Sequence, residues 1–164
     1  MRIITGSARG VRLKSPAGDG TRPTADRTRE AVFSILGNRV VDARVLDLFA
    51  GTGALALEAL SRGAVCAVLI DRATQAILME NARRTKMEKY VEIRRGDVFG
   101  QAAALARTGR AFDLIFADPP YGQGDHIRVL SAVDAGRLLA EGGLLILEQG
   151  ADESVAEHMG RLSL

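Results

Sequence analysis

Four residues that could activate an amine follow the apolar run Phe112–Ala117: Asp118, Pro119, Pro120 and Tyr121. Proline fixes φ and has no amide hydrogen, so the carboxylate and the carbonyl oxygens face no competing N–H donors. Such acceptors can hold the two N–H bonds of an exocyclic amine on a base and turn its lone pair toward an electrophilic methyl group, while the tyrosine ring stacks on the base. A carboxylate with a pKa of about 4 can then take the released proton.

A second candidate site is the glycine turn that follows the apolar run Val45–Phe49. Glycine permits positive φ and close approach of a backbone to a ligand, and open α/β sheets bind ligands at the carboxyl ends of their strands. Residues 51–56 also match the G-x-G-x-x-A pattern of dinucleotide-binding turns. Asp47 lies within the apolar run, where an unpaired carboxylate is costly to bury. This favours a ligand site over a plain turn.

Two more carboxylates follow the next two apolar runs. Asp71 directly follows the run Ala64–Ile70. It could accept hydrogen bonds from both ribose hydroxyls of an adenosine, as in NAD and S-adenosylmethionine sites. It could also serve as an N-terminal carboxylate for the helical segment near Ala73. Asp97 closes the run Val91–Ile93 and could meet an adenine amino group, although Gly-Asp is a common turn. Together they indicate a nucleoside cofactor without choosing one.

Alternating apolar and amphipathic segments position these residues. The apolar runs already described are followed by a last one at Leu144–Leu147. Helical segments are expected between them, at Ala54–Arg62, Ala73–Met87, Gln101–Arg107 and Ile127–Leu139. Strands that are apolar at every position suit a sheet covered on both faces. The pattern predicts an α/β fold with a Rossmann-like, doubly wound, mostly parallel sheet, and the length of 164 residues suits a single domain.

The N-terminal part is expected to be a basic arm, residues 1–23, ahead of a catalytic core, residues 24–164. Residues 1–14 alternate loosely between apolar and polar side chains, which predicts a short β-hairpin. A loop follows, and Thr24 is expected to cap a helix that runs to about Leu36.

Positive charge is concentrated in residues 1–29, where basic residues exceed acidic ones by five although the whole chain has a net charge of only +2. Such a patch could bind a phosphate backbone, and it could equally be a solvated surface that has no partner. The basic residues predicted to contact RNA are Arg2, Arg9, Arg12, Lys14, Arg22, Arg27 and Arg29.

Several classes of protein are disfavoured by composition. Cys66 is the only cysteine, so neither an internal disulfide nor a cysteine-based zinc site is expected, and a cytoplasmic setting fits. His126 and His158 lack metal-ligand spacing, and no metal is expected. No stretch approaches the roughly 18 apolar residues of a membrane span, so no membrane partner is expected.

These motifs resemble those of class I S-adenosylmethionine-dependent methyltransferases with the (Asp/Asn)-Pro-Pro-(Tyr/Phe) motif. More narrowly, the chain resembles the bacterial 16S ribosomal RNA guanine-N2 methyltransferases over residues 1 to about 148. The Arg-Pro-Thr-x-Asp-x-x-Arg-Glu stretch is its most family-specific part. The narrower resemblance rests on Arg2–Gly6, Arg9, Gly10, Leu13, Arg22–Glu30, Phe33, Leu46–Gly53 and Asp118–Tyr121.

The resemblance implies methyl transfer from S-adenosylmethionine to guanine N2 of 16S RNA, within a 30S subunit or an assembly intermediate, by what we expect to be a monomer. It implies that Gly51 and Gly53 approach the methionine part, that Asp71 holds the ribose and that Asp97 meets adenine. The implied cofactor set is Asp47, Phe49, Ala50, Gly51, Thr52, Gly53, Asp71, Asp97, Val98 and Asp118. The implied target-base site is Asp118, Pro119, Pro120 and Tyr121.

Three alternatives stay open. A DNA adenine-N6 methyltransferase uses the same tetrapeptide, although this chain has no room for a separate target-recognition domain. An NAD-dependent oxidoreductase explains the glycine pattern but not residues 118–121. An inactive RNA-binding module is suggested only by the segment after Leu144–Leu147, which is short for the family. We therefore expect a shortened C-terminal sheet edge, with Gly160–Leu164 as a remnant last strand.

Overall fold

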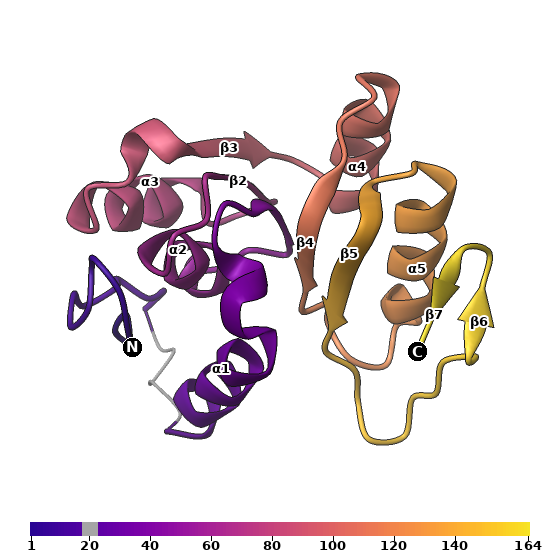
Figure 1. Cartoon of the computed structure of the whole chain (residues 1–164), viewed down its shortest axis with the longest axis horizontal. Helices are drawn as coiled ribbons and strands as arrows, with labels where there is room; N and C mark the ends of the chain where they lie inside the picture. Colours follow the sequence, from indigo (N-terminus) through magenta and orange to yellow (C-terminus); the bar gives the residue numbers. More distant parts are fainter. Residues whose placement is uncertain (18–22) are drawn as a thin grey trace.

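The structure, a computed structural model, describes residues 1–17 and 23–164 and is built around one parallel sheet (Figure 1). Within these residues, five strands follow the order β3-β2-β1-β4-β5, and all neighbours are parallel. The strands are β1 (Arg44–Leu48), β2 (Cys66–Asp71), β3 (Val91–Arg95), β4 (Phe112–Ala117) and β5 (Leu139–Leu147). The predicted Rossmann-like α/β sheet is confirmed.

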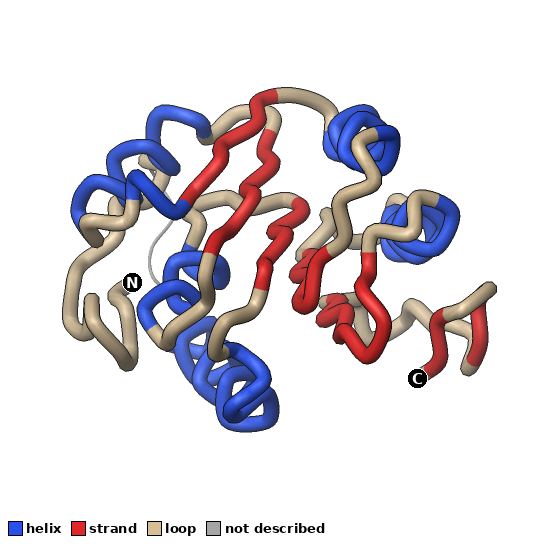
Figure 2. The backbone as a smooth tube through the Cα atoms, turned by 45° about the horizontal axis from the view of Figure 1, so that its top comes forward, coloured by secondary structure: helices blue, strands red, loops and turns tan. Residues whose placement is uncertain are grey.

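Helices cover both faces of this sheet (Figure 2). They are α1 (Pro23–Leu36), α2 (Ala54–Ser61), α3 (Gln75–Arg84), α4 (Val98–Arg107) and α5 (Asp125–Ala135), with short 3-10 helices at Gly37–Val40 and Glu88–Tyr90. Buried side chains of α1, α2 and α3 form one apolar cluster with the sheet, and those of α4 and α5 form another. Val45 and Leu46 belong to opposite clusters, which explains why β1 is apolar at successive positions. None of the described helices is long and apolar enough to cross a membrane.

The predicted N-terminal hairpin forms no regular strands: within residues 1–17 its two arms meet at a single antiparallel bridge, between Arg2 and Arg12, where the Ile3 amide donates to Val11 and the Leu13 amide to Met1, each at 3.0 Å. Side chains of α2 bind amides of the stretch between these two arms, so the pairing does not extend. The Glu58 carboxylate accepts the amides of Ile4 (2.8 Å) and Thr5 (3.0 Å). The segment is therefore held to α2 as an irregular loop.

The same segment is pressed closely against the end of α2. Gly6 has a φ of +89°, and a Cβ atom there would lie 1.8 Å from the carbonyl oxygen of Ser61. The Ser61 hydroxyl also accepts the amide of Ala8 at 2.9 Å. Helix α1 begins at Pro23 instead of being capped by Thr24, and proline suits the first turn of a helix because its missing N–H would be unpaired there anyway.

The C-terminal edge differs from its prediction in two ways. Strand β5 begins at Leu139, five residues before the predicted Leu144. The last residues form β6 (His158–Met159) and β7 (Leu162–Ser163), a separate antiparallel pair among the described residues. This pair lies beside α5 (Figure 1), and the Arg161 amide donates to Asp134 of that helix at 2.9 Å. The predicted remnant strand therefore does not extend the main sheet.

Candidate functional site

A cleft of about 290 Å³ opens at the carboxyl edge of the sheet. The strand order reverses between β1 and β4, and open α/β sheets bind ligands at such a switch point. The cleft is lined by Phe49, Asp71, Arg72, Asp97, Val98, Phe99, Pro120, Gln123, Asp125 and Arg128. Five of these residues were predicted from the sequence for the cofactor or the target base: Phe49, Asp71, Asp97, Val98 and Pro120. The others come mainly from α4 and α5.

Asp71 orders the glycine turn after β1. Its carboxylate accepts the amide of Gly51 at 2.9 Å, and also those of Ala73 (2.8 Å) and Thr74 (3.0 Å). Burial alone would raise the pKa of Asp71, but these amides hold the pKa below its usual value. The carboxylate therefore stays ionised at neutral pH. A carboxylate has about four acceptor positions, so it can accept a further bond from a ligand.

The turn itself requires glycine. Gly53 has a φ of +78°, and a Cβ atom there would come within 3.0 Å of the side chains of Leu69 and Leu78. Gly51 also has a positive φ, of 56°. A ligand can therefore approach the bare backbone of this turn without displacing side chains.

Asp47 is a buried carboxyl group beneath the turn, 2% exposed. Burial raises its pKa to about 8, the charges of Asp118 and Asp71 add to the effect, and the Ala56 amide opposes it. Its Oδ2 atom has no hydrogen-bond partner among the described residues. At neutral pH this group is therefore largely protonated, and its unpaired atom is an observation that favours a polar ligand above the turn.

Asp47→Asn is expected to make the free energy of unfolding less dependent on pH. Because the folded-state pKa of about 8 lies above the ordinary value near 4, the unfolded chain releases this proton first. The contribution of Asp47 to the free energy of unfolding is therefore fully present below about pH 4. It is lost as pH rises through about pH 8, by at most about 1.4 kcal/mol per pH unit. Urea unfolding of both proteins across this range checks the result. Parallel pH curves for the two would contradict it.

Asp97 lies at the wall of the cleft, where it caps α4. One carboxylate oxygen accepts the amide of Gly100 at 2.8 Å, and the other lies 3.1 Å from the guanidinium of Arg72. The Gly100 amide, and then Arg72, lower the pKa of Asp97. It is exposed, so a contact with adenine stays a prediction.

An aromatic pair forms another wall, and of its two rings only Phe49 was predicted from the sequence. The rings of Phe49 and Phe99 meet edge to face with centroids 6.0 Å apart. The Arg128 guanidinium lies 3.8 Å from the centre of the Phe99 ring and is held by Asp125 at 2.7 Å. The pairing of Asp125 with Arg128 three residues later was visible in the sequence, but the stacking depends on how α4 packs against α5.

The predicted target-base loop leaves the end of β4 next to β5. Asp118, Pro120 and Tyr121 are exposed, whereas Pro119 is buried. The pKa of Asp118 is raised to about 6, because packing around its carboxyl group removes water and because Glu148 is negatively charged. The Tyr121 hydroxyl donates a hydrogen bond to Glu148, a residue that the sequence analysis did not select.

A second carboxylate holds this loop to the segment after β5. Glu153 accepts the amides of Gly122 (3.1 Å) and Gly150 (2.8 Å), and it lies 3.2 Å from the Nδ1 atom of His126. These contacts lower the pKa of Glu153. Glu148 thus holds the last residue of the tetrapeptide, and Glu153 holds the stretch from Gly122 to His126.

The residues predicted to contact RNA fall into three groups. Arg29 is buried, 4% exposed, and its guanidinium binds the carbonyl of Arg2 and the carboxylate of Asp26. It holds the arm to α1 and is not available to a phosphate, which corrects its prediction. Arg22 lies outside the described residues. The exposed ones are Arg2, Arg9, Arg12, Lys14 and Arg27.

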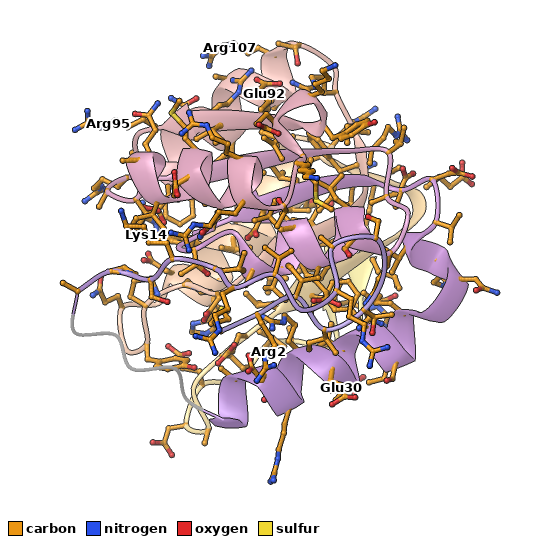
Figure 3. The ribbon with its side chains drawn as sticks, turned by 90° about the vertical axis from the view of Figure 1, so that its left-hand side faces the viewer. Arg2, Lys14, Glu30, Glu92, Arg95 and Arg107 are labelled. Carbon is orange, nitrogen blue, oxygen red and sulfur yellow. The ribbon has the colours of Figure 1, made fainter. Side chains whose placement is uncertain are left out.

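Residues 1–14, the described part of the arm that carries most of the exposed basic side chains and is here called the basic segment, are joined to the glycine turn through α3. Figure 3 shows Lys14 beside α3 and Arg2 beside α1. The buried Asn81 side chain accepts the Lys14 amide at 2.6 Å and donates to the carbonyls of Lys14 (2.9 Å) and Thr52 (2.8 Å). Residues 1–14 are thus connected through Asn81 to the glycine turn.

Known proteins are similar to this chain in both sequence and fold. The family model described as conserved hypothetical protein 95 matches residues 1–164. Ribosomal RNA small subunit methyltransferase D of Escherichia coli K12 is 36% identical over 157 residues, which cover 94% of this chain and 77% of that protein. YlbH of Bacillus subtilis is 36% identical over 164 residues, covering 99% and 89%. The structure of a hypothetical protein of Thermus thermophilus has a TM-score of 0.83 at 34% identity, covering 94% of this chain and 89% of that one.

Proposed function

Because the chain belongs to the family described as conserved hypothetical protein 95, we propose that it transfers a methyl group from S-adenosylmethionine to the exocyclic N2 amine of a guanine in small-subunit (16S) ribosomal RNA. The observation that carries the proposal is the meeting of two features at one switch point of the sheet. A glycine turn ordered by Asp71 follows β1, and an acceptor-rich loop beginning at Asp118 follows β4.

The residues around the cleft fit S-adenosylmethionine. The bare turn at Gly51 and Gly53 suits the methionine part, and the ionised Asp71 suits ribose hydroxyls. The edge formed by Asp97 and the aromatic pair of Phe49 and Phe99 suits adenine. When bound, the cofactor supplies an electrophilic methyl group on a sulfonium.

The loop residues are assigned to the target base. Asp118 and the carbonyl of Pro119 accept the N–H bonds of the amine and orient its lone pair. The exposed ring of Tyr121 stacks on the base. After transfer, the ionised Asp118 takes the proton that the amine releases. The exposed cations of the basic segment hold the RNA backbone.

The pH dependence of kcat/KM is expected to show an acid limb near pH 6. The pKa of Asp118 is raised to about 6, so below that pH its carboxyl group is protonated and loses an acceptor. Well below pH 6, kcat/KM should fall by about tenfold per pH unit. Initial rates from pH 5 to 8 check this, with the residual activity of Asp118→Asn as control. The same limb in that variant would contradict the assignment.

The function is tested by incubating the purified protein with labelled S-adenosylmethionine and under-methylated small subunits. RNA mass spectrometry should find new N2-methylguanine, and folded protein that produces none would overturn the proposal. Duplex DNA offered as a competing acceptor separates it from an adenine-N6 methyltransferase. Free RNA, assembly intermediates and mature subunits, compared as substrates, test our expectation that an assembling particle is the acceptor.

A further inference from the structure

Two carboxylates leave the sheet side by side at the target-base loop. Asp118 follows β4 and Glu148 follows β5, and these two strands are neighbours in the sheet (Figure 1). The strands are paired to their last residues, Ala117 with Leu147, and the Glu148 amide donates to the Ala117 carbonyl at 2.9 Å. Because parallel strands lie about 4.8 Å apart, the two side chains start from adjacent positions at the same edge.

Side-chain interactions confirm that Glu148 belongs to this loop. It is exposed, and it accepts a hydrogen bond from the Tyr121 hydroxyl. Its negative charge also contributes to the raised pKa of Asp118. An ionised carboxylate has about four acceptor positions and no donor, so the bond from Tyr121 leaves it able to accept another. Glu148 therefore presents acceptors beside the residues assigned to the amine and to base stacking.

We propose that Glu148 selects guanine by accepting the hydrogen bond of the ring N1–H, next to the N2 amine held by Asp118 and Pro119. This proposal rests on the proposed function and deepens it. In guanine the ring nitrogen beside the amine carries a hydrogen. In adenine the corresponding N1 carries a lone pair, which a carboxylate repels.

The tetrapeptide alone cannot make this distinction, because an exocyclic amine of either purine offers it the same two N–H bonds. A site that pairs with a donor strongly rejects an analogue that lacks the donor, since its own polar group is then left unpaired. An acceptor-only group beside the amine site is therefore sufficient to favour guanine over adenine.

The test replaces the target guanine, once mass spectrometry has located it, with 2-aminopurine in the same RNA. This base keeps the exocyclic amine but has a lone pair at N1. We expect the wild-type kcat/KM to favour guanine by about 100-fold or more. Glu148→Gln should reduce that preference by at least about tenfold, because its amide can donate to the lone pair. Loss of the O6 atom affects both proteins alike and cancels in the comparison.

Glu141→Gln is the matched control, because it makes the same change near the start of β5, at the opposite end of that strand from Glu148, and it should keep the wild-type preference. Affinity for S-adenosylhomocysteine should be the same in all three proteins. Equal loss of activity on both bases in Glu148→Gln, with the preference retained, would give Glu148 a merely structural role and overturn the proposal. Wild-type protein that methylates neither base would instead overturn the proposed function itself, and with it this proposal.

Discussion

Asp118→Ala is expected to lower the rate of methyl transfer by about 10²–10⁴-fold while leaving the affinity for S-adenosylhomocysteine within about twofold. The substitution removes both the acceptor that orients the amine and the group that takes its proton. Asp118→Asn keeps a carbonyl acceptor, so its rate of methyl transfer should lie between those of Asp118→Ala and the wild type. Single-turnover assays with saturating cofactor measure the rate, and calorimetry measures the affinity.

Asp113→Ala is the control for this pair, because Asp113 lies near the start of β4, at the opposite end of that strand from Asp118, where it pairs with Arg44. It should leave transfer unchanged. Undiminished turnover in Asp118→Ala would remove Asp118 from the chemistry. A large loss of cofactor affinity would instead move its role from the target base to the cofactor.

Glu58→Ala is expected to reduce the free energy of unfolding by about 3–5 kcal/mol. Glu58 is 0% exposed, and its carboxylate accepts the amides of Ile4 (2.8 Å) and Thr5 (3.0 Å) and the Nε of Arg62 (2.9 Å). The buried Arg29 lies 3.9 Å away. Alanine would leave these donors and charges without their buried acceptor. Breaking a buried network of this kind is among the costliest single changes.

Urea denaturation of Glu58→Ala checks this value against Glu80→Ala. Glu80 also pairs with two arginines, Arg83 and Arg84, but on the exposed face of α3. Its removal should cost far less, because water replaces the partner. Equal losses for the two variants would show that the Glu58 network is not a main support of the N-terminal segment.

The buried strands were predictable because they are apolar at successive positions and covered on both faces. β4 matches its prediction at both ends, and β1 and β3 differ by one or two residues. β5 was predicted too short because Glu141, Gly142 and Gly143 interrupt its apolar pattern. That first part lies at the sheet edge, where Glu141 and Gly142 are exposed, so burial does not select apolar residues there.

The N-terminal segment shows what local patterns cannot predict. Its alternation resembles a hairpin, yet its amides bind the Glu58 and Ser61 side chains more than 50 positions away. Arg29 belongs to a basic run in sequence, but the fold buries it against α2. Both departures from the predictions have the same cause: hydrogen-bond partners distant in sequence override local periodicity and charge counts.

Within the site, the sequence identified groups at the ends of strands and missed those that packing brings in. Asp71 and the glycine turn lie together because neighbouring parallel strands end at one edge. Phe99 and Arg128 depend on helix packing, and no spacing in the sequence links them. Glu148 could have been found, because it directly follows an apolar run in the same way as Asp118.

A crystal structure with S-adenosylhomocysteine tests the central claim most directly, because the claim is that Asp118 and the Pro119 carbonyl face the methyl donor. The sulfur should lie beside the turn at Gly51 and Gly53 and point toward this loop, with the ribose on Asp71. A ligand bound at another edge of the sheet, or a loop turned away from the sulfur, would contradict the account.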